Sequence, residues 1–330
     1  MDTISKAIEK YIEMKKTSRS ENTAKTYRRA TNAFRECLLD HGIDPDIELA
    51  EKIDDAMILW FIDFLQNGLV PSTISLYLTA TTQFYEFLAT EEVGNHNLTR
   101  IRGLIKQRTR RPSLRLPQFP KDEIEKVIDY AQDLVSKQSD GEADHLRNMR
   151  DRAFILALAD TGLRVHEACS LKRGDIDWNE GRAIIIGKGD RQDIIRFSRR
   201  SLNALKEYLS TRSKLDGASG KALSSLPLFT RHDKGAGKNV KPIVTDTGRD
   251  IITLRVKECL GDEFVKLITP HKFRHYFVTR VVQSSQNLKL AQGLARHSNI
   301  QITQRYAHLS DEEMDKGYHE AIENLSLGEP

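Results

Sequence analysis

The stretch HKFRHYFVTR, residues 271–280, places two histidines and an arginine within five positions. Positions three and four apart lie on the same side of an α-helix, so His271, Arg274 and His275 would form one patch of hydrogen-bond donors. Such a patch is compatible with a metal site, a solvated surface or a clamp for an anionic ligand.

The metal interpretation has the weaker support. His271 and His275 have a suitable i,i+4 spacing, but the glutamate of an HExxH motif and an obvious third ligand are missing. Lys272 and Arg274 between them would also oppose a bound cation. A phosphate clamp fits better, because the guanidinium of Arg274 can hold two phosphate oxygens and His271 can donate another hydrogen bond.

Two further stretches carry candidate polar residues. In TGLRVHEACSL (161–171), Arg164 and Glu167 are spaced i,i+3; taken alone, such a pair is a surface ion pair of little stabilising value. In IIIGKGDRQDIIRF (184–197), β-rich runs at 182–186 and 193–197 flank a glycine-containing turn and predict a hairpin. Lys188 is at its tip; taken alone, a turn lysine only aids solubility. The P-loop spacing is absent.

The fourth stretch is LARHSNIQITQRYAHLS (294–310). Ser298 and Gln301 form a capping-box pattern that predicts a helix starting just after His297. A continuous helix would place His297 and Tyr306 on opposite sides, whereas a break at Ser298 allows them to converge. A lone tyrosine is usually a half-buried core residue, so its role depends on the other motifs.

Taken in order, TGLR-x-x-E, G-K-G, H-x-x-R-H and a histidine followed nine residues later by tyrosine resemble the tyrosine recombinases, or phage integrase family, with an Xer-like two-domain architecture. The resemblance covers the whole chain in architecture and is specific over about 161–310. It implies a site-specific DNA recombinase that cuts and rejoins duplex DNA through a 3′-phosphotyrosine, without metal or cofactor.

The resemblance also implies a role for each matching residue. Arg164 and Arg274 would hold the scissile phosphate, and Glu167 would orient the arginine pocket. Lys188 would protonate the leaving 5′-oxygen, and Tyr306 would attack. His271 would donate a hydrogen bond or carry a proton, and His297 would donate a further hydrogen bond. His275 is interpreted as structural.

One departure from the family pattern precedes the second histidine. The family usually has Leu-Gly there, whereas this chain has Ala295-Arg296. If the glycine serves a left-handed backbone position, Arg296 would cost about 1 kcal/mol or more; otherwise the turn differs.

Patterning along the chain predicts a mainly α-helical protein with a small β-hairpin. We expect a domain of four amphipathic helices at 1–107, a basic linker at 108–117, and an α+β domain at 118–330. The resemblance implies that the first is a SAM-like, core-binding (DNA-binding) domain and the last a catalytic domain. Between 99 and 115 the chain has seven basic residues and no acidic one; these candidate DNA contacts are Arg100, Arg102, Lys106, Arg108, Arg110, Arg111 and Arg115. This run is either a solvated linker or an extended strap along phosphates.

Composition limits the remaining possibilities. A net charge of +4 is compatible with double-stranded DNA as partner. The sequence contains no run of eighteen or more apolar residues, so we expect no membrane span. The N-terminus does not have the layout of a secretion signal. The three separated cysteines favour reduced thiols in the cytoplasm. The resemblance further implies a prokaryotic or mobile-element origin and a clamp closed around DNA. It also implies a tetramer on two DNA sites, with residues 311–325 docking on a neighbouring copy, and accessory DNA-bending proteins.

Two other functions use the same motifs. A type IB topoisomerase would share the chemistry and relax supercoils as a monomer. A DNA-binding regulator on the same fold would bind without cutting.

Overall fold

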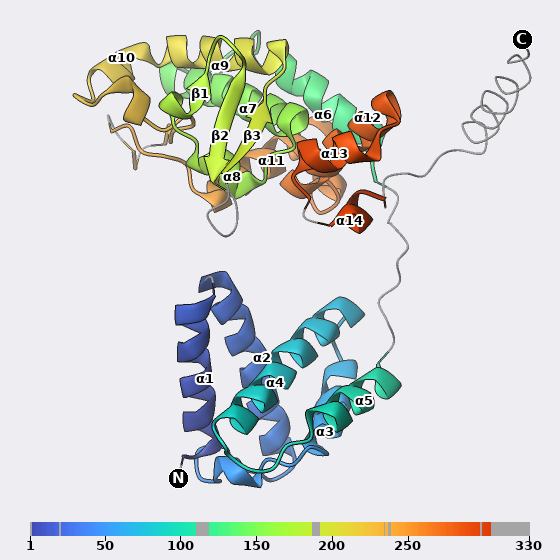
Figure 1. The fold of residues 1–330 in the computed structure, drawn as a ribbon. Helices are drawn as coiled ribbons and strands as arrows, with labels where there is room; N and C mark the ends of the chain where they lie inside the picture. Colours follow the sequence, from blue (N-terminus) through green and yellow to red (C-terminus); the bar gives the residue numbers. More distant parts are fainter. Residues whose placement is uncertain are drawn as a thin grey trace, which may run out of the picture. The chain divides into compact units, whose positions relative to one another are not determined.

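The chain forms two compact units, Met1–Arg115 and Leu116–Pro330, each with its own hydrophobic core. The computed structural model describes residues 2–19, 21–109, 119–186, 192–233, 235–236, 239–297 and 299–304. Figure 1 shows the elements of both units.

The first unit is a helical bundle. Its elements are α1 (Ile4–Ser18), α2 (Glu21–Asp40), the 3-10 helix η1 (Ala50–Lys52), α3 (Met57–Gln66), α4 (Pro71–Thr90) and α5 (Leu98–Arg108). Apolar residues at helical spacing turn inward, as Phe34 on α2 and Phe61 on α3 do, with ring centroids 5.2 Å apart. Pro71 starts α4, where a missing backbone N–H is harmless.

Helix α5 is a fifth helix in a unit where four were expected, and it includes part of the basic run for which an extended strap was one expectation. Residues 98–108 are helical rather than extended, because the side chain of Asn97 caps the helix, accepting from the backbone N–H of Arg100 at 2.9 Å. Ile101 is fully buried. Arg102 also has a counter-charge, since it pairs with Glu86 on α4.

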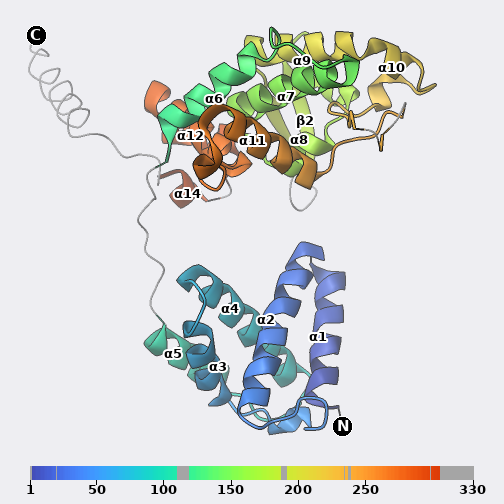
Figure 2. The ribbon, with the colours of Figure 1, turned by 180° about the vertical axis from the view of Figure 1, so that it is seen from behind.

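The second unit is mainly helical with one small sheet. Its helices are α6 (Lys121–Asp133), α7 (Glu142–Thr161), α8 (Val165–Ser170), α9 (Arg199–Thr211), α10 (Ser213–Gly217), α11 (Thr245–Leu260), α12 (Pro270–Ser285), α13 (Leu288–Ala295) and α14 (Ile300–Gln304), with 3-10 helices η2 (Arg173–Asp175), η3 (Leu223–Ser225) and η4 (Asp262–Phe264). In both views α10 lies at one end of this unit and α12 to α14 lie at the other (Figures 1 and 2). The predicted fold class is confirmed.

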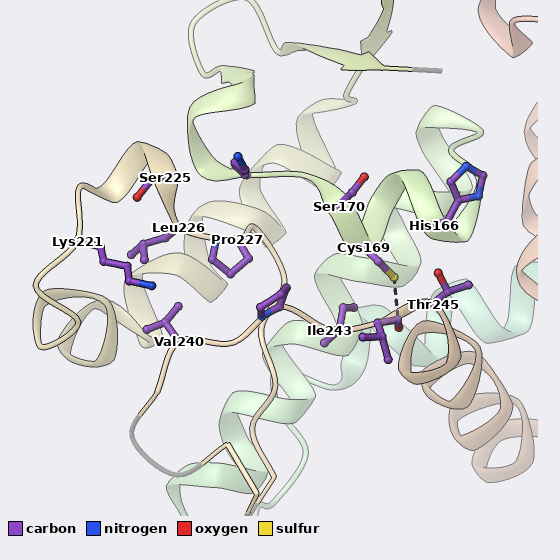
Figure 3. A pocket seen from close by; sticks show the side chains of 13 residues that line it. His166, Cys169, Ser170, Lys221, Ser225, Leu226, Pro227, Val240, Ile243 and Thr245 are labelled. Carbon is purple, nitrogen blue, oxygen red and sulfur yellow. Dashed lines mark hydrogen bonds between the residues drawn. The ribbon is translucent and has the colours of Figure 1, made fainter. Parts of the chain in front are cut away.

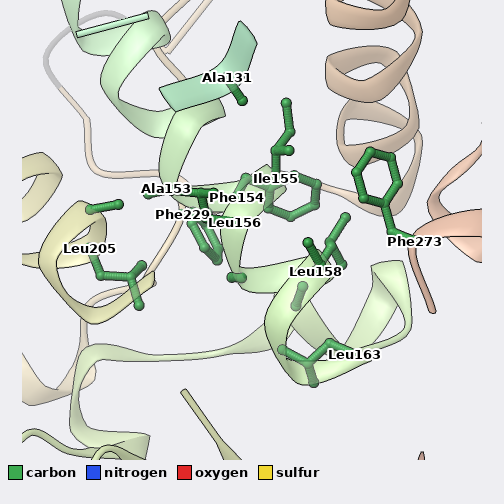
Figure 4. Close-up of a cluster of buried hydrophobic side chains, with 14 of the residues drawn as sticks. Ala131, Ala153, Phe154, Ile155, Leu156, Leu158, Leu163, Leu205, Phe229 and Phe273 are labelled. Carbon is green, nitrogen blue, oxygen red and sulfur yellow. The ribbon is translucent and has the colours of Figure 1, made fainter. Parts of the chain in front are cut away.

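Helix α7 lies in the middle of this unit. Its second half reads AFILALADT and is buried nearly all round, as expected of a helix surrounded by others. Phe154, Ile155 and Leu158 of α7 meet side chains from α6, α9 and α12 (Figure 4). Because α7 is fixed on several sides, its C-terminal end is a rigid place from which to build a site.

The sheet contains the predicted hairpin. Strands β2 (Arg182–Ile186) and β3 (Gln192–Arg196) are antiparallel, with Ile186 opposite Gln192, and a short unpredicted strand, β1 (Ile176–Asp177), pairs with β2. The turn at 187–191, which contains Lys188, lies outside the described residues. None of the described helices combines the length and apolar character that crossing a bilayer requires.

Candidate active site

The site begins at the turn that ends α7. Gly162 has φ 62° and ψ 23°, a left-handed conformation in which glycine avoids the clash of a Cβ atom. A Cβ here would also lie 2.4 Å from a ring carbon of Phe277 on α12. Glycine therefore permits both the turn and the close approach of α12, and its carbonyl oxygen becomes an acceptor for the arginines described below.

Arg164 and Glu167 form the first pair of the site. Arg164 is the N-cap of α8 rather than a residue within it, and its backbone N–H donates to Glu167 Oε2 at 2.8 Å. Its guanidinium Nη1 donates to Glu167 Oε1, also at 2.8 Å. The pair is not a simple surface ion pair, because the Glu167 side chain is 3% exposed while Arg164 is 44% exposed. The buried Glu167 carboxylate can thus fix the position of Arg164 while part of the Arg164 guanidinium stays accessible to solvent.

Arg274 enters from α12. It is buried, and its Nη1 donates to the carbonyl oxygen of Gly162 at 2.6 Å while its Nη2 donates to that of Ala295. These two bonds connect α12 to the ends of α7 and α13. They also fix the orientation of the guanidinium, since a planar donor group held at two points cannot rotate.

The two histidines of α12 stack edge to face, with ring centroids of His271 and His275 4.4 Å apart. Burial, followed by the charges of Arg274, Arg164 and Lys272, lowers the pKa of His271. Burial, followed by the electrostatic effects of His271, Lys272, Arg274 and His297, lowers the pKa of His275 to about 4. Both rings are therefore neutral at pH 7, and each can donate one N–H.

Arg296 occupies the left-handed position that a glycine would favour. Its φ of 57° and ψ of 44° end α13, so the first of the two alternatives for this turn is correct, at a cost of about 1–2 kcal/mol. Its side chain is 4% exposed and pairs with Glu167, with Nη2 and Oε2 3.0 Å apart. This contact was not predicted from the sequence. The signal that could have pointed to it is the arginine at a position where the family usually has glycine.

His297 follows directly. Its Nδ1 lies 2.9 Å from the hydroxyl of Thr303 on α14, a separate helix that begins at Ile300. Ser298 of the predicted capping box lies outside the described residues. Burial and then the charges of Arg274, Arg164, His271 and Arg296 lower its pKa to about 4. The two residues before His297 contact Arg274 and Glu167, through the Ala295 carbonyl oxygen and the Arg296 side chain, so His297 lies beside the other candidate residues.

Some of the predicted residues lie outside those that the structure describes. They are Lys188, Tyr306, the linker residues Arg110, Arg111 and Arg115, and the docking segment 311–325. Four other basic residues, Arg100, Arg102, Lys106 and Arg108, are exposed on α5. A cavity of about 380 Å³ between α4 and α5 is lined by Arg102 and Lys106 together with Ser75, Thr79 and Thr82.

A separate cavity of about 520 Å³ lies beside α8 and includes none of the candidate residues. Cys169 points across it toward the start of α11, where its thiol donates to the carbonyl oxygen of Val244 at 3.6 Å (Figure 3). The candidate site lies elsewhere, around the end of α7, the first turns of α12 and the end of α13. Arg164 and His271 are exposed there, whereas Glu167 and Arg274 are buried.

Chemically, the cluster has the charge and the donors that an anion site needs. Three guanidinium groups and one carboxylate leave it positive while the histidines are neutral, and the donors are held before any ligand arrives. Preorganised donors of this kind stabilise the charge that develops on the non-bridging oxygens of a phosphodiester under attack. Fold and site together fit the class of enzymes that act on phosphodiesters.

The chain belongs to the phage integrase family, the tyrosine recombinases, which cleave and rejoin DNA. The model described as "Phage integrase family" matches residues 118–313, and the "Phage integrase SAM-like domain" matches residues 3–99. The chain is 30% identical over 310 residues to a tyrosine recombinase XerC of Bacillus pumilus (strain SAFR-032), covering 93% of this chain and 92% of that protein. The resemblance inferred from the motifs is thereby confirmed.

Solved structures show the same fold. The Tn1549 transposon integrase in complex with a circular intermediate DNA superposes with a TM-score of 0.68 at 16% identity, covering 97% of this chain and all of that one. The XerH site-specific recombinase bound to difH substrate gives a TM-score of 0.64 at 18% identity, covering 96% of this chain and 84% of that one.

Proposed function

We propose that this chain is a site-specific recombinase that cuts and rejoins duplex DNA at the cluster around Arg164 and Arg274, with Tyr306 as nucleophile. The observation that carries the proposal is the convergence of Arg164, Arg274 and the end of α13, just before His297, onto one positive site. Helix α14 starts from this site, and Tyr306 comes two residues after its last residue, Gln304. Relatives matched over both units do not favour the topoisomerase alternative.

The reaction follows from the roles of the side chains. The Tyr306 hydroxyl gives its proton to the neutral ring of His271, which acts as proton carrier. The Tyr306 oxygen forms a bond to phosphorus, while the bond from phosphorus to the 5′-oxygen breaks. Lys188 donates the proton that the leaving 5′-oxygen takes up. Arg164 and Arg274 stabilise the added charge on the phosphoryl oxygens. The product is a 3′-phosphotyrosine, so the reverse attack by a 5′-hydroxyl rejoins the strand without ATP.

The partner in this proposal is double-stranded DNA, contacted by the basic residues of α5 and the linker as well as by the site. Assembly as a tetramer on two DNA sites, docking through residues 311–325, help from accessory DNA-bending proteins, and association with the nucleoid belong to the same proposal.

The test is covalent capture of DNA. The protein is expressed in a host that carries its target, denatured, and the attached DNA is recovered and sequenced. Wild-type protein should yield enriched ends at defined sites, whereas Tyr306→Phe should yield none while still binding DNA. Covalent DNA recovered equally from Tyr306→Phe, or from neither protein even with a nicked duplex that traps the intermediate, would contradict the proposal.

A second variant tests the pocket. Arg274→Lys keeps one charge but loses the two-point attachment to the carbonyl oxygens of Gly162 and Ala295. We expect single-turnover cleavage to slow by about 100- to 1000-fold. Arg280→Lys is the matched control on the same helix, because Arg280 is 57% exposed and lies 3.7 Å from Glu125, outside the cluster.

A further inference from the structure

We propose that Arg296 is a positioning residue of the active site, which acts by holding the Glu167 carboxylate in place beneath Arg164. The inference rests on the proposed function for the role of Arg164. It rests on the structure alone for the interaction between Arg296 and Glu167.

A chain of contacts links Arg296 to both phosphate-binding arginines. Glu167 uses Oε1 for the guanidinium of Arg164 and Oε2 for Nη2 of Arg296, at 2.8 and 3.0 Å. The carboxylate therefore lies between two guanidinium groups, one 44% exposed and one 4% exposed. Arg296 Nη2 also lies 3.4 Å from the carbonyl oxygen of Gly162, the acceptor that Arg274 uses. Arg296 thus touches the supports of both Arg164 and Arg274.

Arg296 is also unfavourably placed for an arginine. It has a left-handed backbone, and its Nε and Nη1 are buried without a hydrogen-bond partner among the described residues. A strained backbone and unsatisfied donors persist only where the surrounding structure requires them, and they are typical of functional sites. Glycine would fit the backbone better, so the side chain supplies the reason for arginine.

The charge of Arg296 acts directly on Glu167. Although burial favours the protonated carboxyl, the charge of Arg296, followed by the bonds and charge of Arg164, lowers the pKa of Glu167. Helix α11 also packs on α8, which contains Glu167. Its Arg249 lowers the pKa of Cys169 and is not among the charges that act on Glu167. Asp193 on β3 acts on Arg296 and opposes the effect of its burial. Arg296 is therefore the largest of the charges that keep Glu167 ionised.

The first experiment measures thermal unfolding of four full-length proteins: wild type, Arg296→Gly, Glu167→Gln and the double variant. At pH 7, Arg296→Gly should lower Tm by about 3–6 °C when Glu167 is present, because the carboxylate loses its partner. In the Glu167→Gln background the same change should leave Tm unchanged or raise it, because it removes strain and a buried unpaired charge. Equal shifts in both backgrounds would overturn the inference.

The control is Gln286→Gly. Gln286 also has a left-handed backbone, with φ 49°, but it is an exposed C-cap of α12. Its shift in Tm should be the same in both backgrounds. This arm needs no DNA, so it tests the Arg296–Glu167 interaction even if the proposed function fails.

The second experiment separates positioning from folding. Single-turnover cleavage of a nicked duplex carrying the captured site is followed between pH 4.5 and 8. Without Arg296 the pKa of Glu167 rises, so the acid side of the rate profile should move to higher pH in Arg296→Gly. It should stay close to wild type in Arg296→Lys, which keeps the charge. A slower rate with an unmoved profile in Arg296→Gly would contradict a positioning role.

Discussion

At the scale of single residues, burial and the positive surroundings of the site together determine the protonation of its histidines. Burial is the largest cause, and the neighbouring guanidinium groups add to it, so that the pKa values of His275 and His297 fall to about 4. Neutral imidazoles avoid adding charge to a site that already holds three guanidinium groups. A phosphate that enters the site would oppose this effect and favour protonation.

The lowered values predict how stability depends on pH. In the unfolded chain the histidines take up protons with a pKa near 6.5, whereas the folded chain resists protonation until about pH 4. Between these limits the unfolded state binds more protons, so the free energy of unfolding should fall as pH falls from 6.5 to 4. His232, buried against Tyr208 with a pKa of about 3, contributes in the same direction.

Circular dichroism at pH values from 7 to 4.5 would measure this loss, and His275→Gln should reduce it. Nuclear magnetic resonance titration of the His275 ring should give a midpoint near 4 in the folded protein. The same protein in denaturant supplies the control, with a midpoint near 6.5. A folded midpoint at that value would show the ring to be fully solvated.

Sequence patterns predicted the kinds of side chain in the site but not all of their contacts. Arg164, Glu167, Arg274 and His297 were predicted because their motifs, taken in order, resemble those of the tyrosine recombinases, and the structure brings these residues close together. The contact between Glu167 and Arg296 joins positions 129 apart in sequence. Such a contact depends on how α8 and the end of α13 pack, and a single sequence does not contain that information.

At the scale of elements, the turn after α7 connects three helices. Gly162 lets α12 approach through Phe277, and its carbonyl oxygen accepts from Arg274 and Arg296. A change there should therefore affect stability and catalysis together. The sequence contains this glycine in the TGLR motif, but only the structure gives the reason for it.

Gly162→Ala should destabilise the second unit by about 2–4 kcal/mol, the sum of left-handed strain and overpacking against Phe277. Cleavage by the protein that remains folded should also slow, because Arg274 loses its fixed acceptor. Thermal or urea unfolding measures the first effect and single-turnover cleavage the second. Gly293→Ala on α13 is the matched control: a Cβ there meets open space, so stability should rise by up to about 1 kcal/mol.

Helix α5 shows how an element can be missed. Its many basic residues suggested an extended strap, yet Ile101, Leu104 and Ile105 have the i, i+3, i+4 spacing of a packed helix face, and Asn97 supplies the cap. Burial of this face decided the conformation. Its charged residues are compatible with helix, since lysine and arginine are good helix formers.

At the scale of the whole molecule, positive charge is present on both units. The second unit carries the arginine cluster, and the first presents exposed basic residues on α5 beside the hydroxyl-lined cavity of α4. If both units contact the DNA backbone, affinity must fall steeply with salt, because each neutralised phosphate releases counterions.

Removing charge from α5 should therefore weaken the salt dependence of DNA binding. The triple variant Arg100→Gln, Lys106→Gln, Arg108→Gln keeps a good helix former at each position but removes three charges. The slope of log affinity against log salt should become shallower by about 0.9 for each phosphate that the variant no longer neutralises, or about 2–3 in total. Fluorescence anisotropy on a labelled duplex at salt concentrations of about 50 to 200 mM measures the slope.

Arg102→Gln serves as the comparison, because Arg102 is already paired with Glu86 and should contribute less to DNA binding. Its slope should stay within about 0.5 of the wild-type value, which is less than the effect of one phosphate.

If the triple variant also left the slope unchanged, the charges of α5 would serve only to solvate the helix. DNA contact by this part of the first unit would then have to come from other residues. A shallower slope with unchanged cleavage of the bound DNA would instead assign α5 to binding and the arginine cluster to chemistry.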